Sequence, residues 1–203
     1  MTRPAFQIIR DEHGAVAAVL RSMLQMLERG PEDEPMRFFD VVRAMLFYID
    51  EFPERRHHPK ESELLFPKIA RVAPELAPVI EQLERDHHQG EHRVRELQHL
   101  LLAWELLGEP RRDAFASRLR EYAAFYLDHM RTEETQLLTA SDALAREDWA
   151  ELDAAFGANR DPLAGLEGAA MDKLFTRIVL GAPAPIGLGP ALRRAAEEER
   201  AAA

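Results

Sequence analysis

The chain has 203 residues, of which 46% are apolar and 31% are charged, so it is long enough to bury a substantial globular core. Its formal net charge of −10 argues against a nucleic-acid-binding surface. The lack of cysteine excludes disulfides, thiolate zinc sites and iron–sulfur clusters. Any bound metal must therefore be held by nitrogen and oxygen ligands.

Hydropathy gives no sign of a membrane segment. No apolar run approaches the roughly 18 to 20 residues needed to cross a bilayer, and the first thirty residues lack the apolar centre of a signal peptide. We therefore expect a cytoplasmic protein without a membrane partner.

The first two helices are expected from apolar residues that recur at helical spacing. The first runs from Phe6 to Arg29, where Gly30-Pro31 interrupts the pattern. The second begins near Pro35 and is expected to end or bend around Pro53 and Pro59. The reason is that proline removes a backbone donor and clashes with the preceding turn.

Two further long helices complete the pattern. A third is expected from about Glu75 to Leu107, closed by Gly108-Glu109-Pro110, and a fourth from about Asp113 to Leu138. No stretch shows the apolar–polar alternation typical of strands. The sequence thus predicts an all-α protein, with an up-and-down antiparallel four-helix bundle over residues 1–140.

Residues 141–203 are expected to form an additional C-terminal region with short helices and a tail. Ser141 to Phe156 resembles a fifth helix with Ser141 as a candidate N-cap, and Leu163 to Leu180 carries a second amphipathic piece. The segment GAPAPIGLGP reads as an irregular tail, and the charged, alanine-rich end that follows is expected to be either a solvated helix or disordered. The apolar residues of this extension need a partner, which is either the bundle or a second copy in a homodimer.

Each expected bundle helix places one histidine on its apolar face, and three of the helices add a glutamate one turn later. Residues four apart lie on the same face of a helix, so one ion can contact both. Four histidines would all fall by chance on faces covering about three residues in seven only a few per cent of the time. The candidate ligands are His13, His57, Glu61, His87, Glu91, His129 and Glu133.

Two divalent ions would explain why these groups are buried together. Buried carboxylates without cations are heavily penalised, and buried neutral imidazoles need partners. Seven ligands are too many for one zinc ion, which is usually four-coordinate. They fit two bridged ions with an open position for a small molecule, as in the di-iron sites of helical bundles. Zinc or manganese can occupy the same atoms, since affinity alone does not select iron.

Neighbouring polar residues are expected outside the ligand set. His58 and His88 follow presumed ligands and point about 100° away on an ideal helix, so both are expected at the surface. His58 still has i,i+3 spacing to Glu61, which leaves the choice between His57 and His58 open.

Three tyrosines, Tyr48, Tyr122 and Tyr126, lie on the apolar stripes. Core packing is the ordinary role of such residues. A tyrosine close to an oxygen-reactive metal can also donate a hydrogen bond beside the ligands or be oxidised.

From about Ile8 to Leu138 the chain resembles the hemerythrin-like HHE cation-binding domains. The resemblance is carried by His13, by HHPKE followed by LLFP, by DHHQGE and by HMRTEE. It implies two iron ions and a protein that binds or reacts with oxygen, peroxide or nitric oxide. The iron ligands that it implies are His13, His57, Glu61, His87, His129 and Glu133, with Glu61 and Glu133 as bridges.

Glu91 departs from the resemblance, because oxygen-carrying hemerythrins place a histidine there. As a ligand, Glu91 would add negative charge, favour ferric iron and make oxidation or redox sensing more favourable than reversible oxygen binding. Two other classes stay open: a metal- or redox-responsive regulatory module, and a bundle that holds metal without catalysis. The sequence specifies no organic substrate pocket and leaves open whether the protein is an enzyme.

Overall fold

The computed structural model describes residues 4–31, 35–159, 178 and 180–182. Within these residues all regular structure is helical, and it contains α-helices, wide π-turns (η1, η2 and η5) and short 3₁₀ turns (η3, η4 and η6). The elements in chain order are α1 (Pro4–Arg29), α2 (Pro35–Ile49), η1 (Asp50–His57), α3 (His58–Lys60), η2 (Glu61–Leu65), α4 (Phe66–Val72), η3 (Pro74–Leu76), α5 (Ala77–Leu107), η4 (Glu109–Arg111), α6 (Arg112–Thr132), η5 (Glu133–Leu137), α7 (Leu138–Ala140), η6 (Ser141–Ala143) and α8 (Arg146–Gly157).

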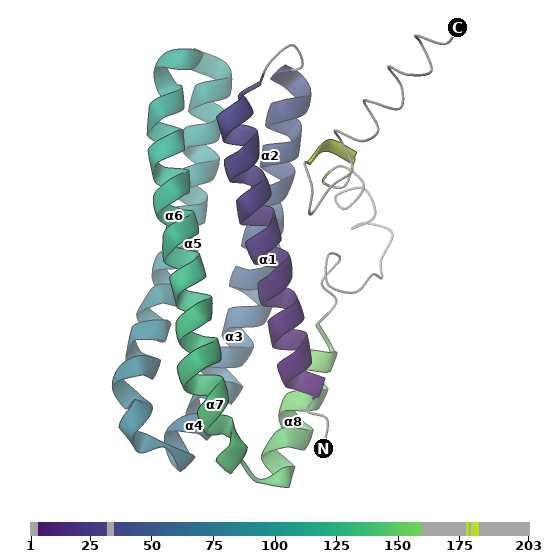
Figure 1. The fold of residues 1–203 in the computed structure, drawn as a ribbon, viewed down its shortest axis with the longest axis vertical. Coiled ribbons are helices and arrows are strands. Elements are labelled where there is room, and N and C mark those ends of the chain that lie inside the picture. The colour runs from purple at the N-terminus through teal and green to yellow at the C-terminus, as the bar shows by residue number, and fades with distance from the viewer. Residues whose placement is uncertain (1–3, 32–34, 160–177, 179, 183–203) are drawn as a thin grey trace, which may run out of the picture.

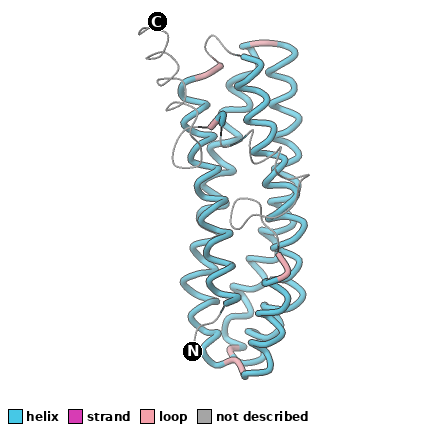
Figure 2. The backbone as a smooth tube through the Cα atoms, turned by 90° about the vertical axis from the view of Figure 1, so that its right-hand side faces the viewer, coloured by secondary structure: helices cyan, strands magenta, loops and turns pink. Residues whose placement is uncertain are grey.

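The helices form an up-and-down antiparallel four-helix bundle, which confirms the fold class expected from the sequence. Helix α1 runs in one direction, the segment from α2 to α4 returns, α5 runs up again, and α6 to α7 returns (Figure 1). Seen from the side, these segments follow one long axis (Figure 2). Helix α1 packs against α2 and α6, and α5 packs against the same two helices, so each has two neighbours in the bundle.

The second bundle helix neither ends nor breaks at its prolines. The chain stays helical from Pro35 to Val72, but it widens into π-turns at η1 and η2. In η1 the backbone N–H of His58 bonds to the carbonyl of Pro53, five residues earlier. Of the two outcomes expected near Pro53 and Pro59, an end of the helix is wrong: Pro53 lies in the widened turn η1, and Pro59 lies in α3 between the two π-turns. Such π-turns are often found at functional sites.

Two glycines end long helices as predicted. Gly30 after α1 and Gly108 after α5 have φ values of 74° and 79°, in the left-handed region that favours glycine. The expected cap of the fifth helix is wrong. Helix α8 begins later, after Ala145, whose N–H is accepted by Asp148 at 3.3 Å, while the Ser141 hydroxyl donates to the carbonyl of Leu138.

The bundle has two hydrophobic cores, one above the other along its axis. The first is built around Leu20, Met45, Trp104 and Phe115, and the second includes Phe66 and residues of α8. In three of the helices the histidine stands between the two cores. The flanking core residues are Ile9 and Val16 for His13, Leu83 and Val94 for His87, and Tyr126 and Leu137 for His129. A polar layer thus divides the interior of the bundle.

Helix α8 belongs to the second core. Its side chains Leu152 and Phe156 are fully buried, and α8 packs along the first turns of α1 (Figure 1). The described part of the C-terminal region therefore finds its apolar partner in the bundle. The predicted segment from Leu163 to Leu180 and the tail lie outside the described residues, apart from 178 and 180–182. In the described part of the chain, no helix combines the length and the apolarity that a bilayer span needs.

We predict that Leu152→Ala lowers the free energy of unfolding by about 2–5 kcal/mol, because it removes a fully buried side chain from the second core. Leu106→Ala is the matched control, since Leu106 is 71% exposed and should cost less than about 0.5 kcal/mol. Urea unfolding followed by circular dichroism measures both. A small loss for both variants would mean that α8 does not unfold together with the bundle.

Candidate metal centre

Buried histidines and glutamates from four helical segments meet between the two cores. Among the described residues they form two groups of candidate ligands, and within each group the ligand atoms lie within 4.8 Å of one another. Every side chain involved is buried. The first group is His13, His57, Glu61 and Glu133, and the second is His58, Glu61, His87 and His129.

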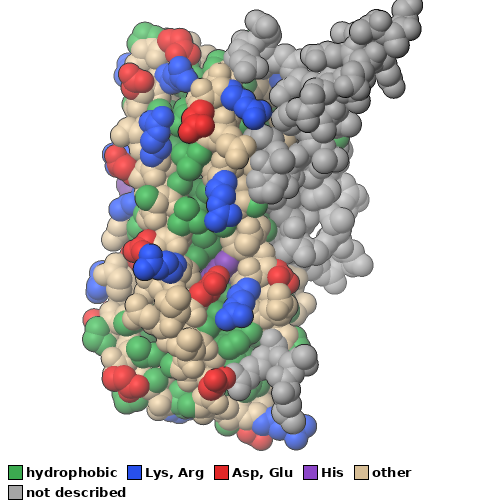
Figure 3. Space-filling model, viewed as in Figure 1, with side chains coloured by type: hydrophobic (Ala, Val, Ile, Leu, Met, Phe, Trp, Pro, Cys, Tyr) green, Lys and Arg blue, Asp and Glu red, His purple; other side chains and the backbone are tan. Residues whose placement is uncertain are grey.

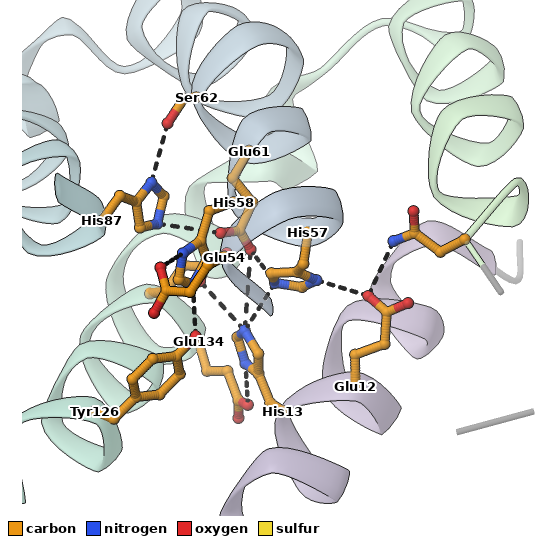
Figure 4. Close-up of polar contacts among 12 residues, drawn as sticks. Glu12, His13, Glu54, His57, His58, Glu61, Ser62, His87, Tyr126 and Glu134 are labelled. Atoms are coloured by element: carbon orange, nitrogen blue, oxygen red, sulfur yellow. Dashed lines mark hydrogen bonds and ion pairs between the residues drawn. The ribbon is translucent and has the colours of Figure 1, made fainter. Parts of the chain in front are cut away.

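Glu61 belongs to both groups. Its Oε1 lies 2.6 Å from His57 Nε2, and its Oε2 lies 3.3 Å from His87 Nε2, so its two oxygens face different groups (Figure 4). Glu133 joins only the first group, with its Oε2 3.4 Å from His13 Nε2. Glu61 therefore lies between the two groups, whereas Glu133 belongs to the first group alone.

Many polar atoms of these side chains are fully buried and lack a well-formed hydrogen bond within the described structure, although several of them make ion-pair contacts with one another. A buried polar group without a partner costs about 1–3 kcal/mol, and charged groups cost more. Cations held by the two groups would satisfy those of these atoms that face the interior of the cluster. The unsatisfied atoms are both carboxylate oxygens of Glu61 and of Glu133, Nε2 of His87 and both ring nitrogens of His129.

Four of the five histidines form a hydrogen bond through Nδ1 on the side away from the cluster, and His129 Nδ1 has a longer contact with Asp86 there. Such a partner holds the proton on Nδ1, so the Nε2 lone pair points inward, which is the usual support of a metal-binding imidazole. The Nδ1 contacts are Glu134 for His13 (2.9 Å), Glu12 for His57 (2.6 Å), Glu54 for His58 (3.0 Å), Ser62 for His87 (3.0 Å) and Asp86 for His129 (3.5 Å). Ser62 in turn donates to Glu84, at 3.0 Å.

In the metal-free protein, protons take the place of cations in the first group. Burial lowers the pKa of His13, but Glu133 and Glu134 outweigh it and raise the pKa to about 9. Burial also opposes a charge on His57, yet Glu61 and Glu12 raise the pKa of His57 well above its ordinary value.

The pKa values of the two carboxylates, Glu61 and Glu133, are shifted in opposite directions. Burial raises the pKa of Glu61, but the nearby His57 and His87 more than reverse this effect and hold it well below the ordinary value. Burial and the charge of Glu61 raise the pKa of Glu133. The site therefore favours positive charge near Glu61, which a metal ion supplies directly.

A sequence profile of the hemerythrin HHE cation binding domain matches residues 5–141, which include all four bundle helices and both candidate groups. The chain belongs to this family. The resemblance found in the sequence is thereby confirmed, and family and geometry together indicate a metal-binding helical domain. No curated protein matches the chain at a significant level. Helix α8 lies beyond the residues that match the HHE domain.

The HHE domain buries His58, which corrects the expectation that this residue lies at the surface. His58 is 5% exposed and belongs to the second group, whereas His88 is exposed as expected. The π-turn explains the difference, because a wider turn brings two successive residues nearer to one face than an ideal helix does. Burial and the neighbouring His87 lower the pKa of His58 well below its ordinary value, so its imidazole is neutral.

Glu91 is outside both groups. Its side chain is 45% exposed and forms an ion pair with Arg95 on the surface of α5. The cluster therefore contains two carboxylates and five imidazoles, and the charge argument built on Glu91 as a third carboxylate loses its basis.

The three tyrosines are buried at different distances from the cluster. The Tyr126 hydroxyl lies 2.8 Å from His58 Nε2, and the Tyr122 hydroxyl donates to Glu54 at 3.3 Å. Tyr48 stacks on Phe52, with ring centroids 5.4 Å apart. Tyr126 is thus in direct contact with a candidate ligand, and Tyr122 reaches the same histidine through Glu54.

Glu54 is a site residue that the pattern of ligands alone did not reveal. It bonds to His58 one turn later, and burial raises its pKa to about 8. Helix α5 makes room for it with Gly90, where an added Cβ would lie 2.8 Å from Glu54 Oε1. Two signals in the sequence were available: the i,i+4 spacing of Glu54 and His58, and the glycine in DHHQGE.

We predict that His58→Gln lowers the zinc bound per chain and weakens binding at least tenfold, because it removes a ligand from the second group. The control is His88→Gln on the exposed face of α5, which should bind zinc as the wild type does. Metal analysis and chelator competition measure both. Equal zinc binding by the two variants would contradict the placement of His58.

We predict that Gly90→Ala weakens metal binding by about tenfold, because the new methyl group forces Glu54 away from His58. Gly14→Ala is the control: it makes the same change within a helix, next to His13, where a Cβ meets nothing within 4 Å. That variant should keep its affinity and gain up to about 1 kcal/mol of stability. If both variants bind zinc as the wild type does, Glu54 does not support the site.

Proposed function

We propose that this HHE domain holds two iron ions and that the pair binds or reacts with oxygen, peroxide or nitric oxide. His13, His57, Glu61 and Glu133 would hold one ion, and His58, Glu61, His87 and His129 the other. Nitrogen and oxygen ligands suit non-haem iron, and zinc or manganese can occupy the same atoms. Iron, when bound, would supply the redox chemistry, and the protein would orient and shield it.

The observation that carries the proposal is the position of Glu61. A buried carboxylate whose two oxygens face separate histidine groups is suited to a pair of ions rather than to one. The oxygens of Glu61 and Glu133 support the same conclusion, because the neighbouring imidazoles meet them as ion pairs without well-formed hydrogen bonds.

A small cavity beside the first group supports a small ligand. Its lining includes His13, His57, His58 and Tyr126, and the cavity has a volume of ≈ 10 Å³. That volume holds about one water molecule. It favours a diatomic molecule or peroxide over an organic substrate.

The surroundings of the cavity fit reactive chemistry kept away from bulk water. Burial raises the pKa of Tyr126 well above its ordinary value, so its hydroxyl keeps its proton and remains a hydrogen-bond donor at the cavity wall. On the face seen in Figure 3, only small patches of histidine surface are visible among the other side chains. The five histidines of the cluster are each 7% exposed or less, so the bundle limits access to small molecules.

The test begins with protein loaded anaerobically with ferrous iron and then mixed with air, peroxide or nitric oxide. We predict two iron ions per chain and a new charge-transfer absorption band, because oxidation or ligand binding changes the electronic state of iron held by imidazole and carboxylate. Glu61→Gln should lose about half of the iron or more and most of the band. Glu63→Gln, an exposed neighbour, is the matched control.

Full iron loading with a silent spectrum would contradict reactivity and leave a bundle that only holds metal. Loading that is the same in wild type and Glu61→Gln would contradict the bridging role.

A further inference from the structure

Helix α8 lies outside the residues that define the HHE domain, yet it packs against the candidate metal centre. The Phe156 ring is fully buried and meets the His57 ring edge-on, with centroids 5.9 Å apart. Nearer the start of α8, Trp149 packs edge-on against Phe6 of α1. The helix therefore forms an extra wall on the side of the bundle where α1 carries His13.

A chain of hydrogen bonds connects the end of α8 to His57. The Asn159 amide donates to Glu12 Oε2 at 3.1 Å. The same oxygen accepts the Nδ1–H of His57 at 2.6 Å (Figure 4). Lys60 donates to the amide oxygen of Asn159 and, at 2.8 Å, to the carbonyl of Ala155.

These contacts stabilise both Glu12 and the C-terminal end of α8. Glu12 is buried, and a buried carboxylate oxygen held by two donors has a fixed position. Fixing Glu12 fixes the ring of His57 and the direction of its Nε2. Ala155 lies in the last turn of α8, where carbonyls lack helical partners and the helix dipole favours a cation, so Lys60 also stabilises the end of α8.

We propose that Asn159 and Lys60 are positioning residues for the metal centre and that docking of α8 and metal binding favour each other. The proposal rests on the ligand set proposed above, but not on the identity of the metal or on its reactivity. When α8 leaves, Glu12 loses its second donor and His57 its aromatic neighbour. When metal binds, His57 and Glu12 are held where Asn159 can reach them. Because linkage is reciprocal, each event changes the other by the same factor.

The first measurement is hydrogen exchange of residues 146–159 in the full chain, with and without zinc. Zinc is the probe because it takes nitrogen and oxygen ligands and has no redox chemistry. We expect zinc to slow exchange in α8 by about tenfold or more, the size of effect typical of groups that support metal ligands. Equal exchange with and without zinc would overturn the coupling.

The second measurement compares zinc affinity among variants by chelator competition. Asn159→Ala should weaken zinc binding about tenfold and remove the zinc-dependent protection of α8. Asn159→Asp keeps the size of the side chain and an acceptor for Lys60 but loses the N–H donor, so it should weaken zinc binding at least as much. Gln136→Ala, which removes an exposed amide at the same end of the bundle, should match the wild type.

The outcomes separate this inference from the proposed function. Unchanged zinc affinity in Asn159→Ala would contradict the positioning role while leaving the metal centre intact. Failure of the wild type to bind zinc would contradict the metal centre and the coupling together. Silence of the iron protein toward oxygen would contradict only the reactivity.

Discussion

The structure depends on how buried carboxylates are compensated at one depth of a helical bundle. Glu61 and Glu133 are fully removed from water, between two apolar cores, and five imidazoles are gathered around them. Isolated charges in such a place would be strongly destabilising. Without metal, protonation of His13 and His57 supplies the positive charge, as their raised pKa values show. A pair of cations would do the same and would also satisfy the oxygens and nitrogens that hydrogen bonds leave unpaired.

The backbone is irregular where the ligands are most crowded. The η1 turn ends at His57, the η2 turn begins at Glu61, and the η5 turn begins at Glu133, so all three border the polar layer. A regular helix sends adjacent side chains in different directions, whereas a π-turn allows His57 and His58 to enter neighbouring groups. Pro53 lies in the widened turn η1, and Pro59 lies in α3 between two such turns, so neither proline ends the helix.

A second layer of polar groups surrounds the candidate metal ligands. Carboxylates and one serine contact the Nδ1 atoms of the five histidines, which orients the rings, and the Tyr126 hydroxyl contacts Nε2 of His58. This outer layer also explains features far from any ligand pattern. Gly90 makes room for Glu54, and α8 brings Asn159 to Glu12. Residues of the C-terminal region and of the bundle therefore share one network around His57.

The sequence by itself determined the helical fold, the family and most members of the cluster. Apolar periodicity reports directly which face of a helix is buried, and a histidine on that face must enter the interior whatever the helix packs against. The same reasoning correctly predicted that His13, His87 and His129 are buried. It failed for His58, because it assumed an ideal helix there. It also failed for Glu91, because it assumed that the residue four positions after His87 would join the same ligand group. Only the tertiary structure decided these positions: the π-turn turned His58 inward, and Glu91 lies at the surface of α5 in an ion pair with Arg95. Contacts between distant segments, such as Asn159 with Glu12, were likewise decided by packing, because no local pattern records which helix will lie beside which.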